Sequence, residues 1–117
     1  NSVIGTGVTI EEGAVVRDSI IMNGTTIGKG CEVNKAIISE YVELGDYVVL
    51  GTFDEQPNKV APHIYAGGLA TIGEHSVIPQ GVQIGKNTAI FGVTKPEDYT
   101  DGKLASGETL IKVGELS

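Results

Sequence analysis

The chain has 117 residues, of which 40% are hydrophobic, 20% charged and only 5% aromatic, and its formal net charge is −7. This acidic balance argues against nucleic acid or an anionic membrane as a partner, because both are bound by clustered Lys and Arg. No apolar run approaches the roughly 18 residues of a membrane-spanning helix, and no secretory signal is visible. The single cysteine, Cys31, excludes an internal disulfide and indicates a reducing cytoplasm.

The first 51 residues contain an internal repeat of 17 residues. Segments 1–17, 18–34 and 35–51 align without gaps, and aliphatic residues recur in columns spaced by six, six and five positions. The columns are Ile4, Ile21 and Ile38; Ile10, Ile27 and Leu44; and Val16, Val33 and Leu50. A six-residue spacing matches neither a helix nor a simple long strand. It predicts a coil with three short flat sides, each one hexapeptide long, whose aliphatic residue points to the axis.

Such coils stack and pair their backbones along the axis, with about 4.8 Å between neighbours. Each aliphatic column then becomes a ladder of like side chains that fills a narrow core, which suits a chain with 17 glycines, two Phe and no Trp. A column of small groups, Ala14, Cys31 and Val48, accompanies the ladders. We therefore predict an all-β fold, a parallel β-helix, in which at least about three coils are needed to bury a core.

The pattern breaks after residue 51 and returns later. The break contains Asp54, Glu55, Pro57, Asn58, Pro62 and His63. The period returns at Ile72, Ile78, Ile84 and Ile90, which are six apart. We predict one domain with three coils over 1–51, an extruded loop at about 52–68 that re-enters by 71, final coils over 72–91, and an irregular tail over 92–117 that lies along the helix or caps its end.

Glycine-rich triplets mark the corners between sides. Their third member is mostly Gly, Asn or His, the residues that best tolerate positive φ. The triplets are Gly5-Thr6-Gly7, Glu11-Glu12-Gly13, Gly28-Lys29-Gly30, Gly45-Asp46-Tyr47, Gly73-Glu74-His75 and Gly85-Lys86-Asn87. Turn geometry accounts for these glycines, and none of them extends to a dinucleotide fingerprint or a P-loop. We therefore predict no phosphate cradle at the corners.

Hexads such as Ile27–Glu32 and Ile84–Ala89 resemble the hexapeptide-repeat family. In that family an aliphatic residue is followed by Gly, Ala, Glu or Asp and, four positions on, by a small residue. The resemblance extends over more than half of the chain. It implies a left-handed parallel β-helix, although ordinary parallel crossovers are right-handed.

Few residues offer catalytic or metal-binding chemistry. His75 occupies a corner column, whereas His63 in the loop is the candidate general base if the chain is an acyltransferase that acts at a trimer interface. Two histidines cannot supply the three-histidine zinc site of carbonic-anhydrase relatives in this fold. Cys31 is expected to be a buried, inert thiol. The carboxylate pairs at 11–12, 54–55 and 97–98 are expected to be solvated, so we predict no catalytic, cofactor or metal residues.

Several sequence segments show a resemblance to a narrower family. Residues 16–22, 27–30 and 36–38 look like the C-terminal domain of bacterial glucose-1-phosphate adenylyltransferase, and residues 67–72 leading into 77–81 are similar to that family's final coil. The resemblance implies an enzyme that joins ATP and glucose 1-phosphate to give ADP-glucose and pyrophosphate for glycogen synthesis. Its active site, with Mg²⁺ beside ATP, lies in an N-terminal domain whose glycine-rich motif is absent from these residues. No catalytic residue of the family can therefore be assigned to them.

The same resemblance implies the partners. In that family the β-helix supports subunit contacts in a tetramer and, with the N-terminal domain, helps form effector sites. We therefore expect the partners to be the chain's own N-terminal nucleotidyltransferase domain and further subunits of a homo-oligomer or hetero-oligomer. Some members carry two effector lysines at positions that are Ala66 and Glu74 here, so the effector-binding residues stay unassigned.

Two other hypotheses stay open. An acyltransferase would use coenzyme A and His63, and a purely structural hexapeptide domain would have no regulatory role. The assembly and allosteric domain is favoured because the chain starts at Asn1 inside a repeat, shows no converging polar constellation and is broken by one loop. We expect a fragment of a longer cytoplasmic enzyme that performs no chemistry alone.

Overall fold

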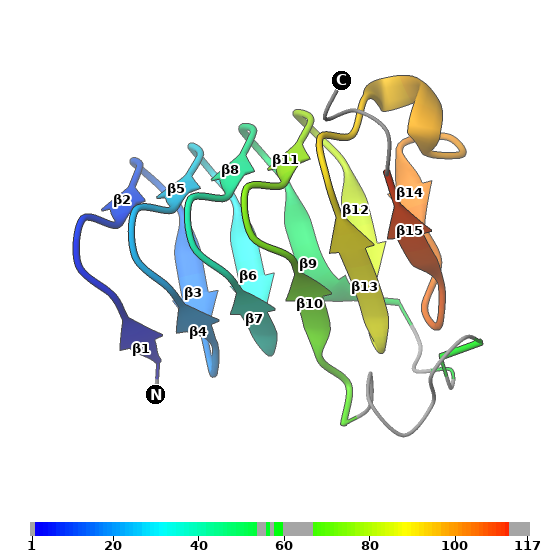
Figure 1. Cartoon of the computed structure of the whole chain (residues 1–117), viewed down its shortest axis with the longest axis horizontal. Helices are drawn as coiled ribbons and strands as arrows, with labels where there is room; N and C mark the ends of the chain where they lie inside the picture. Colours follow the sequence, from blue (N-terminus) through cyan, green and yellow to red (C-terminus); the bar gives the residue numbers. More distant parts are fainter. Residues whose placement is uncertain (1, 54–55, 57, 60–66, 113–117) are drawn as a thin grey trace.

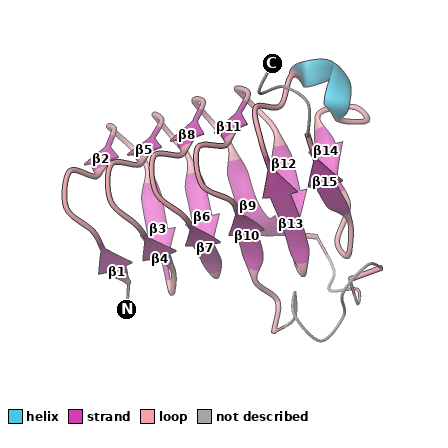
Figure 2. Ribbon diagram, in the orientation of Figure 1, coloured by secondary structure: helices cyan, strands magenta, loops and turns pink. Residues whose placement is uncertain are grey.

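The computed structural model describes residues 2–53, 56, 58–59 and 67–112. In this part of the chain, fifteen strands and one short 3-10 helix, η1 (Pro96–Asp98), wind into successive three-sided coils (Figure 1). Within these described residues, helix is confined to that single turn near the C-terminal end, as Figure 2 shows. Among the described residues, no helix is long and apolar enough to cross a membrane.

Strands at equal positions in successive coils pair in parallel, and three sheets run along the axis. Sheet A consists of β1 (Val3–Ile4), β4 (Ile20–Ile21), β7 (Ala36–Ile38), β10 (Ala70–Ile72), β13 (Thr88–Phe91) and β15 (Thr109–Ile111). Sheet B consists of β2 (Thr9–Ile10), β5 (Thr26–Ile27), β8 (Glu43–Leu44) and β11 (Val77–Ile78). Sheet C consists of β3 (Val15–Arg17), β6 (Glu32–Asn34), β9 (Val49–Thr52), β12 (Gln83–Gly85) and β14 (Lys103–Leu104).

The aliphatic columns predicted from the repeat are confirmed as rungs of these sheets. Within each column the neighbouring residues are direct parallel partners: Ile4, Ile21 and Ile38 in sheet A; Ile10, Ile27 and Leu44 in sheet B; Val16, Val33 and Leu50 in sheet C. Ile72, Ile78 and Ile84 extend the three columns into the next coil. Burying each such side chain contributes about 1.5–3 kcal/mol, which is the main source of stability in a core this narrow.

The predicted corners are also confirmed. All six triplets turn at their third residue with a left-handed φ, from +57° at Asn87 to +78° at Gly13. The three-sided parallel solenoid that results is consistent with the left-handed β-helix that the family resemblance implies.

The interruption predicted at about 52–68 falls between β9, which ends at Thr52, and β10, which begins at Ala70. Sheet A continues across it in register, because Ile72 pairs with Ile38. Residues 54–55, 57 and 60–66 of that loop, and with them Asp54, Glu55, His63 and Ala66, lie outside the described residues.

The expectation of an irregular tail over 92–117 is wrong for residues 103–111. β14 pairs with β12 through Leu104 and Ile84, and β15 pairs with β13 through Leu110 and Ile90. Leu104 and Leu110 are six apart and pack against the core, so the hexapeptide spacing does return. The return of the spacing is not visible in the sequence because, in this described part of the chain, the sheet B side of the coil forms a bridge from Val93 to Val77 instead of a strand. The short helix η1 follows that bridge. Residues 113–117 lie outside the described part.

A substitution at Ile27 tests whether the inward aliphatic columns form the core. Ile27 is fully buried in the sheet B column, so Ile27→Asp places an unpaired charge in an apolar core. We expect a loss of about 4 kcal/mol or more, the range reached only by such mechanisms, measured by thermal or urea unfolding. Thr9→Asp, at an exposed outward position of the same sheet, is the control and should change little. Equal stability of the two variants would show that the inward and outward columns are misassigned.

Candidate functional site

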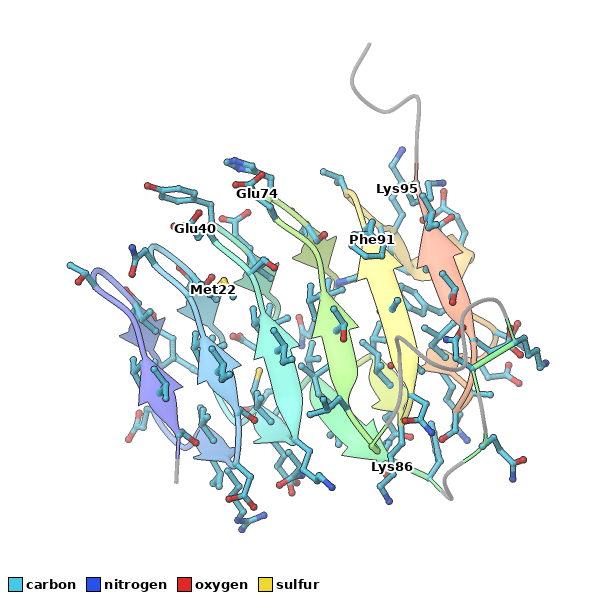
Figure 3. The ribbon with its side chains drawn as sticks, turned by 60° about the horizontal axis from the view of Figure 1, so that its bottom comes forward. Met22, Glu40, Glu74, Lys86, Phe91 and Lys95 are labelled. Carbon is cyan, nitrogen blue, oxygen red and sulfur yellow. The ribbon has the colours of Figure 1, made fainter. Side chains whose placement is uncertain are left out.

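His75, one of the two histidines considered as a catalytic candidate, lies in an aromatic stack at a corner. Its ring stacks on that of Tyr41, with 5.3 Å between centroids and 13° between planes. On its other side the Tyr41 ring covers Gly24, where an added Cβ would lie 2.4 Å from the ring. Figure 3 shows Glu40 and Glu74 on neighbouring coils at this same edge. The corner role predicted for His75 is therefore confirmed, with φ +61°, and stacking accounts for the ring.

Cys31 is buried as predicted. It occupies the inward column with Ala14 and Val48, and its Sγ donates to the carbonyl oxygen of Gly45 at 3.1 Å. Burial raises the pKa of the Cys31 thiol, which disfavours the thiolate that a nucleophile requires. The arrangement suits packing rather than catalysis.

The described ends of the insertion between β9 and β10 are fastened to the last coils by a buried amide network. Asn58, which is 2% exposed, donates from Nδ2 to the Asn87 carbonyl oxygen at 2.8 Å and to the Thr109 hydroxyl at 3.0 Å. Asn87 in turn donates to the Gln56 carbonyl oxygen and accepts from the Gly68 amide. Both sides of the insertion thus meet at the left-handed corner residue Asn87.

Two lysines make further contacts between the insertion and the last coils. Lys59 forms an ion pair with Glu108, and its amide donates to the Gly107 carbonyl oxygen. The Lys86 ammonium donates to the Phe53 carbonyl oxygen at 3.0 Å, and Figure 3 places Lys86 at the foot of sheet A, where β13 begins. Spacing analysis missed this network because it joins Asn58 to residues 29 and 51 positions away. The buried Asn58 thus fastens the described residues of the insertion to the last coils of the solenoid.

A cleft of about 500 Å³ opens near the C-terminal end. Its lining residues are Asp98, Thr100, Asp101, Lys103, Leu104, Ala105 and Glu108. The carboxylates are partly paired, because Glu108 binds Lys59 and Asp98 binds Lys112. Among the described residues, no group of three or more His, Cys, Asp or Glu is arranged to hold a metal ion. The cleft therefore shows neither a metal centre nor a catalytic pair.

The carboxylate pairs differ in their exposure to solvent. Glu11 and Glu12 are exposed, as expected. Asp98 departs from the prediction of solvation: it accepts from the Lys95 amide at 2.8 Å and from the Lys112 ammonium at 3.0 Å, and its side chain is 14% exposed. These contacts hold the pKa of Asp98 below its usual value, with the Lys95 amide as the larger cause. Asp98 thus ties η1 to the strand that ends beside Lys112.

Asn58→Ala should destabilise the protein by about 2 kcal/mol, because it leaves buried partners of the amide without their hydrogen bonds. Gln56→Ala is the matched control, since the Gln56 side chain is exposed and only its carbonyl oxygen joins the network. Chemical denaturation of both variants gives the comparison. Equal stability of the two would mean that the insertion is not held through Asn58.

Asp98→Asn should lower the melting temperature at neutral pH. Because the folded pKa of Asp98 is depressed, its contribution is present above the unfolded pKa of about 3.9 and is lost as the pH falls through the folded pKa. The gap in melting temperature between wild type and variant should therefore be largest at neutral pH and shrink below about pH 4. The exposed neighbour Glu97 supplies the control variant, Glu97→Gln. A gap that is constant with pH would contradict the assignment.

Comparison with known proteins finds sequence similarity to glucose-1-phosphate adenylyltransferases. It is 54% identical over 115 residues to the glucose-1-phosphate adenylyltransferase of Lachnospira eligens, and 38% identical over 115 residues to that of Acetivibrio thermocellus. Each alignment covers 98% of this chain but only 27% of the relative, at its C-terminal part. The chain thus spans about a quarter of the length of the relatives it matches.

Solved structures and a family model give the fold and the family. The acetyltransferase domain of PglB from Neisseria gonorrhoeae superposes with a TM-score of 0.62 at 19% identity, covering 97% of this chain and 46% of that one. That likeness shows the shared fold alone. The model described as GlmU-like, C-terminal hexapeptide, matches residues 1–72. The chain therefore belongs to the GlmU-like family of C-terminal hexapeptide domains.

Proposed function

We propose that the chain is the C-terminal assembly and allosteric domain of a glucose-1-phosphate adenylyltransferase. The observation that carries the proposal is the 54% identity to such an enzyme over 98% of this chain. The intact protein would make ADP-glucose and pyrophosphate from ATP and glucose 1-phosphate, in the cytoplasm, for glycogen synthesis. Mg²⁺ would bind with ATP in its N-terminal nucleotidyltransferase domain, and the subunits would assemble into a homo-oligomer or hetero-oligomer.

The reactive side chains among the described residues support a non-catalytic role for this chain. Cys31 is buried with a raised pKa, and His75 is stacked on Tyr41. The carboxylates of the C-terminal cleft are partly paired with lysines. Within the described residues, these groups do not converge on one point as a nucleophile and its base would.

Allosteric control through an anion at the corner of Glu74 is disfavoured. The resemblance puts an effector lysine at this position in some family members, whereas Glu74 is exposed and lies on the same edge as Glu40 (Figure 3). Two neighbouring carboxylates repel an anion. We infer that an anionic effector of this enzyme, if it binds to the solenoid, uses other residues.

The deciding experiment measures pyrophosphate release from glucose 1-phosphate by the full-length protein with each of the four nucleoside triphosphates. We expect release with ATP and little with UTP, GTP or CTP, and no turnover by the 117 residues alone. Turnover by these residues alone would refute the supporting role. Absence of release with all four would refute the adenylyltransferase and direct attention to His63 and an acyl transfer with coenzyme A.

A further inference from the structure

The corner between sheets B and C carries an exposed tyrosine that is packed on one side only. The Tyr47 ring lies over Gly30 of the preceding coil, where an added Cβ would be 2.5 Å from it. Tyr47 is nevertheless 59% exposed. Among the described residues, no other ring stacks on it. The side of the ring that faces the next coil is therefore available to a ligand.

The corner between sheets A and B shows what such a tyrosine can hold. Tyr41 lies over Gly24 of the preceding coil in the same way. On the other side of its ring the His75 ring of the next coil is stacked, with 5.3 Å between centroids and 13° between planes. A corner tyrosine in this rod therefore accepts a flat ring at the position one coil later.

Gly81 holds that position in the column of Tyr47 but has no side chain. The His75 amide donates to the Glu40 carbonyl oxygen of the preceding coil at 3.0 Å. In the same way the Gly81 amide donates to the Asp46 carbonyl oxygen at 2.9 Å. Both residues have left-handed φ values, +61° at His75 and +78° at Gly81. Among the described residues, no atom lies within 4 Å of a Cβ added at Gly81, so the space that His75 fills at one corner is open at the other.

A carboxylate stands on the far side of this open space. Gln83 pairs with Lys103 across sheet C. The residues two positions earlier are Gly81 and Asp101, so Asp101 holds the same corner one coil later, with a left-handed φ of +52°. Asp101 is exposed and takes part in no ion pair within the described part of the chain. Tyr47 and Asp101 are thus two coils apart, about 10 Å along the axis, which leaves room for one flat group between them.

The charges around this space favour a cation. The face of an aromatic ring is itself negative and attracts positive groups. The chain as a whole carries −7. Three carboxylates and two ammonium groups flank the column: Glu43, Asp46 and Asp101, against Lys29 and Lys103. The balance is negative, so an anionic ligand would be repelled.

We propose that the space between Tyr47 and Asp101 binds the guanidinium group of an arginine side chain on a partner protein. A guanidinium is flat and weakly hydrated, stacks on aromatic faces and forms two parallel hydrogen bonds with a carboxylate. A lysine ammonium is a compact, strongly hydrated point charge and matches only the charge of the site. A small-molecule site usually buries most of its ligand, whereas this open corner offers one stacking face and one carboxylate, which is the scale of a single interface contact.

A second copy of the chain is the competing partner. Its single arginine, Arg17, already donates to the Asn34 Oδ1 at 3.2 Å. Each copy also carries −7, so two copies repel each other on approach. Both observations favour a different partner with a basic surface.

Fluorine NMR of the full-length protein labelled with 3-fluorotyrosine tests the site, and Tyr47→Phe assigns the Tyr47 signal. We expect N-acetyl-arginine amide to shift that signal saturably, while the signal of the buried Tyr99 stays unchanged. N-acetyl-lysine amide, which has the same charge, should bind at least about tenfold more weakly because it cannot stack as a flat group. A shift that does not saturate, or an equal response to both compounds, would overturn the proposal. A Tyr47 signal that moves when the protein alone is concentrated would identify a second copy and overturn a different partner.

Filling the space should block the site. Gly81→His places a ring against Tyr47, as His75 lies against Tyr41, and should abolish the saturable shift. Gly67→His is the matched control, because Gly67 has a similar left-handed φ of +72° and equally open surroundings at a different corner. Unchanged binding in Gly81→His would show that the guanidinium does not lie on Tyr47.

Removing the carboxylate tests the other side of the space without adding bulk. Asp101→Asn should weaken binding about tenfold, because a charge-assisted pair of hydrogen bonds is lost. Asp18→Asn, at another exposed aspartate with a left-handed φ of +49°, should leave binding as it is. If Asp101→Asn binds N-acetyl-arginine amide as tightly as the wild type, the carboxylate plays no part and the proposed site is wrong.

Discussion

The whole structure depends on one repeated contact, the packing of an inward aliphatic side chain on its equivalent in the neighbouring coil. Each such residue contributes about 1.5–3 kcal/mol when buried, and only when a coil lies on both sides of it. Ile27 has both neighbours and is fully buried, whereas Ile10 has one and is 42% exposed. Stability in such a rod is a sum of nearest-neighbour terms. The ends of the rod, more than its sides, are therefore where other parts of a protein can add stability.

The corners are coupled from coil to coil as well. Tyr41 and Tyr47 adopt left-handed φ values of +57° and +61°, at a cost of about 1–2 kcal/mol for residues with a side chain. Each ring lies over a glycine of the preceding coil, Gly24 or Gly30, where an added Cβ would come within 2.5 Å of the ring. The glycine in one coil and the tyrosine in the next thus form a unit. This packing accounts for the two tyrosines that are exposed at the corners.

The sequence was sufficient to predict the parts of the fold that repeat. Ile21 and Ile38 are partners because they are 17 residues apart, and Asn87 turns a corner because it is the third residue of the triplet that follows Ile84. Prediction failed where a polar substitute replaced the repeat. Thr94 and Tyr99 close the core on a side that carries no strand, so the column of Leu104 and Leu110 resumed without a visible period. A tally of aliphatic spacing cannot detect a hydroxyl pair that fills an aliphatic position.

In the candidate site, too, only the residues that belong to a repeating column could be predicted. The burial of Cys31 and the corner position of His75 follow from columns, and both were predictable. The Asn58 network was not, because its partners are distant in sequence and share no period with it. That network connects Asn58 of the insertion to Thr109 in β15, the last described strand. A repeat thus reveals the residues that pack on their own equivalents, whereas a contact between an insertion and a later coil has no equivalent that a spacing could display.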